Sequence, residues 1–263
     1  MSNQPIGVFD SGVGGTSIWK EINNLLPNES IIYLADSKNA PYGEKSKEQI
    51  LQLSIKNTEL LLQKECKLIV VACNTATTNA INYLRENYNI PFIGIEPAIK
   101  PAALKTKTNS IGVLATRGTL SSELFSKTSD LFASGVKVIE QYGDGLVPLI
   151  EADKINSSKM KDLLAKYLQP MIDAKVDYLV LGCTHYPYLI PEIRKILPET
   201  VQIIDSGEAV AKQTNAVLIA NNLENKAYKA SPTLKFYSNT DSNLLKRFLK
   251  DVKMNKEVEY LNF

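Results

Sequence analysis

The chain has 263 residues, a length that fits either one large domain or two domains of ordinary size. Hydrophobic residues make up 44% and charged residues 22% of the sequence, which is close to the average of globular proteins and excludes a fibrous or disordered chain. The 30 basic and 28 acidic side chains leave a net charge of +2, and no segment concentrates lysine and arginine, so we expect no nucleic-acid partner.

The sequence also bears on location and on the state of the cysteines. It begins without the charged and apolar regions of a signal peptide, and no apolar run approaches the ~18 residues that span a bilayer. We therefore expect a cytoplasmic protein that does not enter a membrane. Cys66, Cys73 and Cys183 are too few and too scattered for a disulfide framework, so any role they have is as thiols.

Short apolar runs alternate with longer amphipathic segments along the chain. We interpret the apolar runs as buried strands, which lie at Ile6–Phe9, Ile31–Ala35, Leu68–Ala72, Phe92–Ile95, Ile111–Leu114, Val136–Ile139, Tyr178–Leu181 and Val201–Ile204. Two amphipathic segments, Ser46–Lys64 and Ser158–Ala174, place their apolar residues on one helical stripe. This alternation predicts an α/β fold with mostly parallel sheets flanked by helices.

The second part of the chain repeats the first. The segment Ile-Gly-Val-Phe-Asp-Ser-Gly from Ile6 matches Ile-Gly-Val-Leu-Ala-Thr-Arg-Gly from Ile111, and in both parts the next predicted strand begins 25 residues later. Further on, Val-Val-Ala-Cys-Asn-Thr around Cys73 matches Val-Leu-Gly-Cys-Thr-His around Cys183, and these cysteines lie 67 and 72 residues after the two starting points. A fourth pair of strands also aligns. Four aligned strands indicate a duplicated half.

Two similar parallel sheets carry their functional loops at the carboxyl ends of the strands and can face each other across a cleft. We therefore predict two similar domains related by a pseudo-twofold axis, with the active site in the interdomain cleft and the two cysteines on opposite sides of it. The first domain comprises residues 1–97 plus 208–263, and the second comprises residues 98–207. We expect the last segment to return and cover the first domain with helices, Leu244–Val252 among them.

Cys73 follows an apolar strand and precedes a helix that contains Ile81 and Leu84. Backbone N–H groups and the helix dipole at such a position stabilise a thiolate or a bound carboxylate, and Asn74 and Thr75 are placed to hold such an anion. A buried structural cysteine is the competing interpretation, because free cysteine is among the most buried residue types. The matching cysteine in the repeat favours a catalytic role.

Cys183 occupies the equivalent strand end and is followed two residues later by His185, the only histidine in the chain. The imidazole can activate the thiol, as in a thiol hydrolase, or assist it as a proton donor or electrostatic partner. A core histidine with satisfied hydrogen bonds is the alternative. A zinc site is disfavoured, because these two residues supply only two ligands and no further Cys or His lies nearby in the sequence.

Asp10 and Ser11 end the first strand and precede the glycine loop Gly12–Gly15, so we expect them at the same cleft edge as Cys73. The glycines allow a close backbone approach. Their spacing fails the dinucleotide-binding pattern, because Ser17 stands where that pattern has a third glycine. Asp10 can act in catalysis, cap the following helix, or do both.

Further polar candidates follow other predicted strands. Tyr42 and Gly43, in a Pro-Tyr-Gly turn, can offer a phenol and backbone N–H groups to a ligand, although an ordinary turn is the simpler interpretation. Thr116 and Thr119 are the counterparts of the first glycine loop, where hydroxyls suit a carboxylate; helix caps are the alternative. Glu151 ends an apolar run, and its carboxylate can orient the histidine or be an ordinary surface group.

Four motifs, taken together and in this order, are highly specific. They are Gly-Val-Phe-Asp-Ser-Gly-Val-Gly-Gly from Gly7, Pro-Tyr-Gly from Pro41, Ala-Cys-Asn-Thr-Ala from Ala72 and Leu-Gly-Cys-Thr-His-Tyr-Pro from Leu181. With these motifs the chain closely resembles the glutamate racemases of the aspartate/glutamate racemase superfamily over essentially its whole length. Two segments depart from the family pattern: Thr16-Ser17 replaces the common Leu-Thr, and residues 141–146 replace a segment that usually contains Cys.

The resemblance implies that Cys73 and Cys183 are the two catalytic acid/bases, with Asp10 assisting the first thiol and Glu151 and His185 assisting the second. It also implies a set of substrate contacts: Asp10, Ser11, Tyr42, Gly43, Asn74, Thr75, Thr119, Thr184 and His185. The implied reaction is the cofactor-independent interconversion of L- and D-glutamate, which supplies D-glutamate for bacterial peptidoglycan, and the implied assembly is a homodimer. We expect no metal and no pyridoxal phosphate, because no lysine lies in a recognisable Schiff-base setting.

Racemisation requires a proton to leave one face of a carbon and another to arrive on the opposite face, and two opposed thiols meet that need. Three other functions remain open. An aspartate or broad-specificity racemase differs only in the substrate that the cleft accepts. A noncatalytic amino-acid-binding or regulatory protein would bind a ligand without exchanging its proton. A thiol hydrolase is disfavoured, because Cys183 and His185 lie too close in sequence to form the usual spatially assembled pair.

Overall fold

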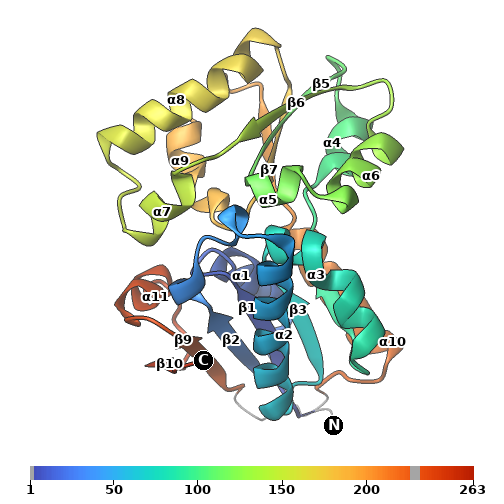
Figure 1. Ribbon diagram of the computed structural model, residues 1–263, viewed down its shortest axis with the longest axis vertical. Coiled ribbons are helices and arrows are strands. Elements are labelled where there is room, and N and C mark those ends of the chain that lie inside the picture. The colour runs from blue at the N-terminus through green and yellow to red at the C-terminus, as the bar shows by residue number, and fades with distance from the viewer. Residues whose placement is uncertain (1–2, 226–231) are drawn as a thin grey trace.

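The computed structural model describes residues 3–225 and 232–263, which form two lobes (Figure 1). Within these residues the first lobe is built on a six-stranded sheet and the second on a four-stranded sheet. All the strand pairings among the described residues are parallel. This confirms the predicted α/β fold with two parallel sheets flanked by helices.

Helices cover both faces of the first sheet. Its strands lie in the order β10 (Lys256–Tyr260), β9 (Leu234–Ser238), β2 (Ile31–Ala35), β1 (Ile6–Asp10), β3 (Leu68–Val71) and β4 (Phe92–Gly94). One face packs on α1 (Thr16–Leu25), α10 (Gly207–Ala220) and α11 (Asn243–Phe248), and the other on α2 (Lys47–Gln63) and α3 (Asn74–Asn87). Two short 3-10 helices, η1 (Ser37–Asn39) and η2 (Tyr42–Glu44), follow β2. Burial on both faces explains why these strands are nearly continuous apolar runs.

The second lobe has the same layered plan. Its strands lie in the order β6 (Lys137–Tyr142), β5 (Ser110–Ala115), β7 (Tyr178–Gly182) and β8 (Gln202–Ile204). One face packs on α4 (Ile99–Lys105), α5 (Arg117–Leu120) and α6 (Glu123–Phe132). The other packs on α7 (Leu146–Glu151), α8 (Ser158–Asp173), η3 (Tyr186–Leu189) and α9 (Ile190–Ile193). Each cysteine therefore follows a strand that is central in its sheet.

The strand orders support the duplication that the sequence indicates. The order β2-β1-β3-β4 in the first sheet corresponds to β6-β5-β7-β8 in the second. The register differs at one place, because Ile6 pairs with Ile31 whereas Ile111 pairs with Val138, two residues later than the sequence alignment predicts. A turn at Gly135, with φ of 82°, precedes β6 and takes up the difference. A shift of two residues leaves each side chain on the same face of the strand.

Two expectations about strands need correction. The last segment was expected to cover the first domain with helices, Leu244–Val252 among them. It also adds two strands, β9 and β10, and α11 ends at Phe248 rather than Val252. β9 alternates buried and half-buried residues, as a strand with two unequal faces does. The predicted strand Val136–Ile139 is not buried, because β6 lies at the edge of its sheet and alternates exposed with half-buried side chains.

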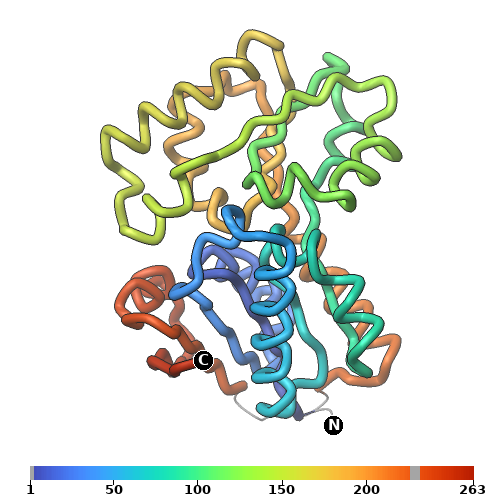
Figure 2. Tube along the Cα trace, viewed as in Figure 1, coloured from blue at the N-terminus to red at the C-terminus, as the bar shows by residue number. Residues whose placement is uncertain are grey.

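The chain passes between the lobes twice, between β4 and α4 and again between β8 and α10 (Figure 2). After the second passage α10 packs against α1 and β9 pairs with β2, so the last segment belongs to the first lobe. The domain limits 1–97 plus 208–263 and 98–207 stay a prediction. In the part of the chain that is described, no helix combines the length and apolar character needed to cross a membrane.

Candidate active site

A small pocket lies where the carboxyl ends of β1, β3, β5 and β7 meet between the lobes. Its lining residues are Ser11, Pro41, Tyr42, Gly43, Cys73, Asn74, Thr75, Thr116, Val147, Cys183, Thr184 and His185. Both cysteines therefore border the same space, one from each lobe. Of the side chains implicated from the sequence, Asp10, Thr119 and Glu151 stand behind this lining rather than in it.

Cys73 is the N-cap residue of α3. Its sulfur accepts a hydrogen bond from the backbone N–H of Ala76 at 3.5 Å, and its thiol donates to the Ser11 hydroxyl at 3.7 Å. Burial raises the pKa of Cys73 well above its usual value, and the charge of Asp10 raises it further. Cys73 is therefore a protonated thiol at neutral pH, because burial outweighs the stabilisation that the helix N-terminus offers a thiolate.

Asp10 bonds to the glycine loop of its own lobe and to Thr184 of the second lobe. Its Oδ2 accepts the N–H of Gly15 at 2.7 Å, and its Oδ1 accepts the hydroxyls of Ser11 and Thr184, each at 3.4 Å. Burial raises the pKa of Asp10, while the positive charge of His185 opposes that rise. The carboxylate thus supports the turn before α1 and also faces the second lobe, which combines the two roles that the sequence left open.

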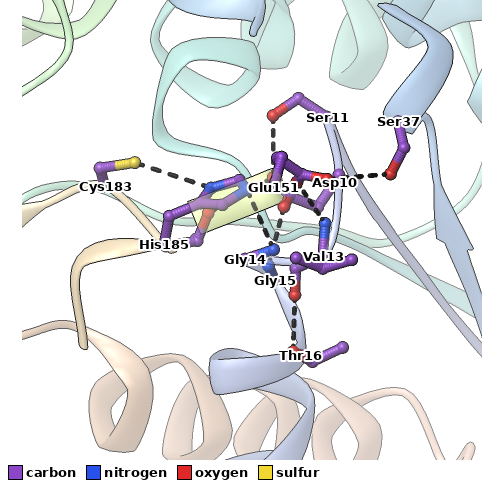
Figure 3. Close-up of polar contacts among 12 residues, drawn as sticks. Asp10, Ser11, Val13, Gly14, Gly15, Thr16, Ser37, Glu151, Cys183 and His185 are labelled. Atoms are coloured by element: carbon purple, nitrogen blue, oxygen red, sulfur yellow. Dashed lines mark hydrogen bonds and ion pairs between the residues drawn. The ribbon is translucent and has the colours of Figure 1, made fainter. Parts of the chain in front are cut away.

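Cys183, His185 and Glu151 form a contact chain on the other side of the pocket (Figure 3). The Cys183 sulfur lies 3.9 Å from His185 Nδ1, and His185 Nε2 lies 2.6 Å from Glu151 Oε1. Burial lowers the pKa of His185, but hydrogen bonds to Cys183 and Glu151 outweigh burial and raise the pKa well above its usual value. His185 is therefore an imidazolium at neutral pH, and such a cation stabilises a thiolate beside it.

The glycine loop of the first lobe reaches across to this chain. The N–H of Val13 donates to Glu151 Oε1 at 2.8 Å, and the N–H of Gly14 points at His185 Nε2 from 3.3 Å. A protonated Nε2 cannot accept from Gly14, so the shorter contact with Glu151 is the hydrogen bond that holds the ring. The Ser37 hydroxyl, which the sequence did not single out, approaches Glu151 Oε2 at 3.4 Å. Its place after the second strand was the available signal.

The charge of His185 makes stability depend on pH. Because its folded pKa lies above its unfolded value, its stabilising contribution is complete below about pH 6.5 and is lost as the pH rises through the folded pKa. We expect the free energy of unfolding of the wild type to fall relative to His185→Gln by up to about 1.4 kcal/mol per pH unit above that point. Urea unfolding of both proteins at pH 6 and pH 9 measures this; a constant difference would contradict the assignment.

Asn74 is the most direct sign of a ligand. It is 3% exposed, and neither its Oδ1 nor its Nδ2 has a hydrogen-bond partner among the described residues. Leaving a buried polar group unpaired costs about 1–3 kcal/mol, so a native structure keeps such a group for a reason. Because Asn74 lines the pocket, a bound molecule with both a donor and an acceptor would satisfy its amide.

Three threonines join the lobes at the edge of the pocket. Thr75 on α3 lies 2.8 Å from Thr116 and 3.3 Å from Thr119, and Thr116 and Thr119 are 3.0 Å apart, all measured between hydroxyl oxygens. Thr75 and Thr116 line the pocket, whereas Thr119 supports them from behind. Thr116 was absent from the predicted substrate contacts, although its position in the repeat pointed to it.

Tyr42 and Gly43 both line the pocket. The Tyr42 hydroxyl donates to Asp36 Oδ2 at 2.5 Å and accepts from Asn57 at 3.1 Å, so it is satisfied within the first lobe. The phenol is therefore held by protein partners, and its contact with a substrate stays a prediction. At Gly43 a Cβ atom would lie 2.8 Å from the Cβ of Thr116, which shows how closely the lobes approach here.

Two thiols from different lobes that border one small pocket are both placed to exchange protons with a molecule bound there. The sequence profile of the Asp/Glu/Hydantoin racemase family matches residues 6–214, and this chain belongs to that family. A glutamate racemase of Herpetosiphon aurantiacus is 48% identical over 225 residues, which cover 86% of this chain and 89% of that protein.

Solved structures agree over the whole chain. The glutamate racemase isoform RacE1 from Bacillus anthracis superposes with a TM-score of 0.87 at 32% identity, covering 100% of this chain and 99% of that one. The glutamate racemase of Francisella tularensis, solved in complex with D-glutamate, gives a TM-score of 0.84 at 31% identity and covers 99% and 98% of the two chains. The two-lobed fold is thus that of the glutamate racemases.

Proposed function

We propose that this chain interconverts L- and D-glutamate, with Cys73 and Cys183 as the two acid/bases. The relatives described above are glutamate racemases, and one of them is solved with D-glutamate bound. The observation that carries the proposal is that the two thiols, one from each lobe, border the same pocket. That pocket is also lined by Asn74, whose amide has no hydrogen-bond partner within residues 3–225 and 232–263.

The protonation states of the side chains around the pocket suit a two-base reaction. Cys73 carries its proton, and Cys183 lies beside an imidazolium that stabilises a thiolate. In this state the Cys183 thiolate takes the Cα proton from one face of the substrate, and the Cys73 thiol gives its proton to the opposite face. Afterwards Cys183 is the thiol and Cys73 the thiolate, so the same site is set for the other enantiomer.

The remaining polar groups bind the substrate and stabilise the carbanion. Asn74 and the threonine hydroxyls at the lobe junction hold the carboxylates of glutamate, and Thr184 lies next to the second thiol. Stabilisation of the carbanion comes from these fixed donors in a site from which water is excluded. The pocket is small in this closed arrangement, so substrate access requires the lobes to separate. The proposed chemistry uses no cofactor.

Incubation of the purified protein with L-glutamate in heavy water tests the proposal. We expect optical rotation to fall to zero while deuterium enters Cα, because each inversion takes its new proton from solvent. A parallel incubation with L-aspartate separates a glutamate racemase from an aspartate or broad-specificity enzyme. Ligand binding without deuterium incorporation would instead indicate a noncatalytic binding protein and would refute the proposal.

Removal of the Asn74 amide separates binding from folding. We expect Asn74→Ala to raise KM for glutamate by about 10- to 100-fold, the value of a hydrogen bond to a charged group. The same substitution should leave the free energy of unfolding equal or higher, because it deletes a buried group that has no partner among the described residues. Steady-state kinetics and urea unfolding measure both effects; a stability loss with unchanged KM would assign Asn74 a structural role.

We propose further that the enzyme works in the cytoplasm as a homodimer and supplies D-glutamate for cell-wall peptidoglycan. The activity of the relatives supports the metabolic role. Sedimentation equilibrium across a range of protein concentrations tests the dimer, and a single species of 29.1 kDa would refute it.

A further inference from the structure

Tyr188, a residue of the second lobe, packs against side chains of the first lobe. Its hydroxyl lies 2.6 Å from Thr16 Oγ1 at the start of α1, and its ring packs edge-on against Phe248 of α11 with ring centroids 4.6 Å apart. The ammonium of Lys20 lies 5.2 Å from the same ring. Three side chains of one lobe thus surround one side chain of the other, beside the segment that carries Cys183 and His185.

The direction of the hydrogen bonds follows from counting protons. Thr16 has one hydroxyl proton, and it donates this proton to the Val13 carbonyl at 2.6 Å. Tyr188 must therefore donate to Thr16. Burial raises the pKa of Tyr188 to about 12, so its proton is present throughout the neutral range. Thr16 is fully buried and is the acceptor that this proton requires.

These bonds continue into the catalytic side chains. Val13, whose carbonyl Thr16 holds, donates its own N–H to Glu151 at 2.8 Å. Glu151 contacts His185, and His185 contacts Cys183. The path starts at residue 188 and ends at residue 183, so it closes into a ring that passes through the glycine loop of the opposite lobe. We call this path the Tyr188–Cys183 ring. A second tie lies beside it, since the Ser17 hydroxyl donates to the Thr184 carbonyl at 2.9 Å.

We propose that Tyr188 and Thr16 are positioning residues for the Cys183 side of the reaction: their hydrogen bond fixes Val13, and through it the Glu151–His185 pair that faces Cys183. The proposal rests on the proposed function. It gives a role to Thr16-Ser17, the pair that departs from the family pattern. A leucine at residue 16 would leave the Tyr188 hydroxyl without its acceptor.

The ring acts on one thiol rather than on both. Cys73 is held by Ser11 and Ala76, which are not members of the ring. The charged and titratable groups that face His185 are Glu151, Cys183 and Asp10. Loosening the ring therefore alters the environment of His185 and Cys183 and leaves the contacts of Cys73 in place.

The single histidine allows a test that does not depend on turnover. Protein labelled with ¹⁵N-histidine shows only the His185 imidazole, whose titration we would follow in wild type, Tyr188→Phe and Thr16→Val. We expect both variants to move the midpoint of the His185 titration to lower pH, because Glu151 is no longer held against the imidazole. Tyr167→Phe is the matched control: it removes a hydroxyl that donates to the Asp144 carbonyl at 2.8 Å in the same lobe. Its His185 titration should be that of the wild type.

Unchanged His185 signals in both ring variants would overturn the proposal, whatever their activity. If the wild type itself failed to racemise glutamate, the proposed function would be refuted. The His185 titration would still test whether Tyr188 and Thr16 position His185. Two different substitutions at the two ends of one bond guard against a variant that does not fold.

A second measurement shows whether the effect is confined to one face. Solvent deuterium exchange at Cα of each enantiomer is followed in Cys73→Ser, which keeps Cys183, and in Cys183→Ser, which keeps Cys73. We expect Tyr188→Phe to slow exchange about tenfold in the first background, the effect of losing one hydrogen bond, and to change it less than twofold in the second. Equal slowing in both backgrounds would indicate a general structural role and would refute the proposal.

Discussion

Replacement of either Cys73 or Cys183 by alanine is expected to abolish racemisation, with kcat lowered by about 10³- to 10⁴-fold or more. Each substitution leaves one face of the substrate without a group that can take or give a proton. The two effects should be similar in size, because a complete turnover uses both thiols. Circular dichroism of glutamate solutions incubated with each variant measures the rate of inversion directly.

The third cysteine provides the matched control. Cys66 is buried like the other two, and burial raises its pKa to about 12, but it packs against Gly7 in the first lobe away from the pocket. Cys66→Ala should therefore retain wild-type kcat and lose only stability, by about 1 kcal/mol for the lost packing. Full activity in Cys73→Ala or Cys183→Ala would defeat the two-thiol mechanism.

The second large effect is expected at Gly14, where a single methyl group would hold the lobes apart. A Cβ atom there would lie 2.2 Å from His185 Nδ1 and 2.5 Å from its Cγ, far inside contact distance. Either the imidazole leaves its place beside Cys183 or the lobes do not close. We expect Gly14→Ala to lower kcat/KM more than 100-fold, since misplacing a catalytic group by about 1 Å already costs that much.

The stability of this variant distinguishes a closure defect from a folding defect. The methyl group clashes with the opposite lobe rather than with the core of its own, so the free energy of unfolding should change by less than about 1 kcal/mol. Gly135→Ala is the control: it adds a methyl group in open space at φ of 82°. That variant should lose about 1 kcal/mol of stability and no activity. Wild-type kinetics in Gly14→Ala would show that closure does not need this contact.

Much of the fold was predictable because its signals are local. The strands around Ile6, Leu68 and Tyr178 are apolar runs, and a parallel strand covered on both faces has to be one. The helices from Lys47 to Gln63 and from Ser158 to Asp173 carry both a one-sided stripe and a serine N-cap. β9 and β10 were missed, because neither is buried on both faces: β9 alternates buried with half-buried residues, and β10 is the edge strand with mostly exposed residues.

Within the site, local sequence identified the residues but not their states. Cys73 stands at a helix N-terminus, a position that favours a thiolate, yet the surrounding core raises its pKa. Tyr42 stands in the expected turn, yet its hydroxyl is taken by Asp36. Both outcomes depend on what packs around the side chain, and the sequence near each residue does not contain that information.

By itself the sequence determined the duplicated α/β plan, the placement of one cysteine at the end of a strand in each half, and the glycine loop of the first half. Period, strand ends and repeats lie within short stretches of chain, so they can be recognised without coordinates. Only the tertiary structure decided how the halves meet. The contacts of Val13 with Glu151 and of Thr16 with Tyr188 join residues 138 and 172 positions apart, and closure of the two lobes alone brings such groups within hydrogen-bond distance.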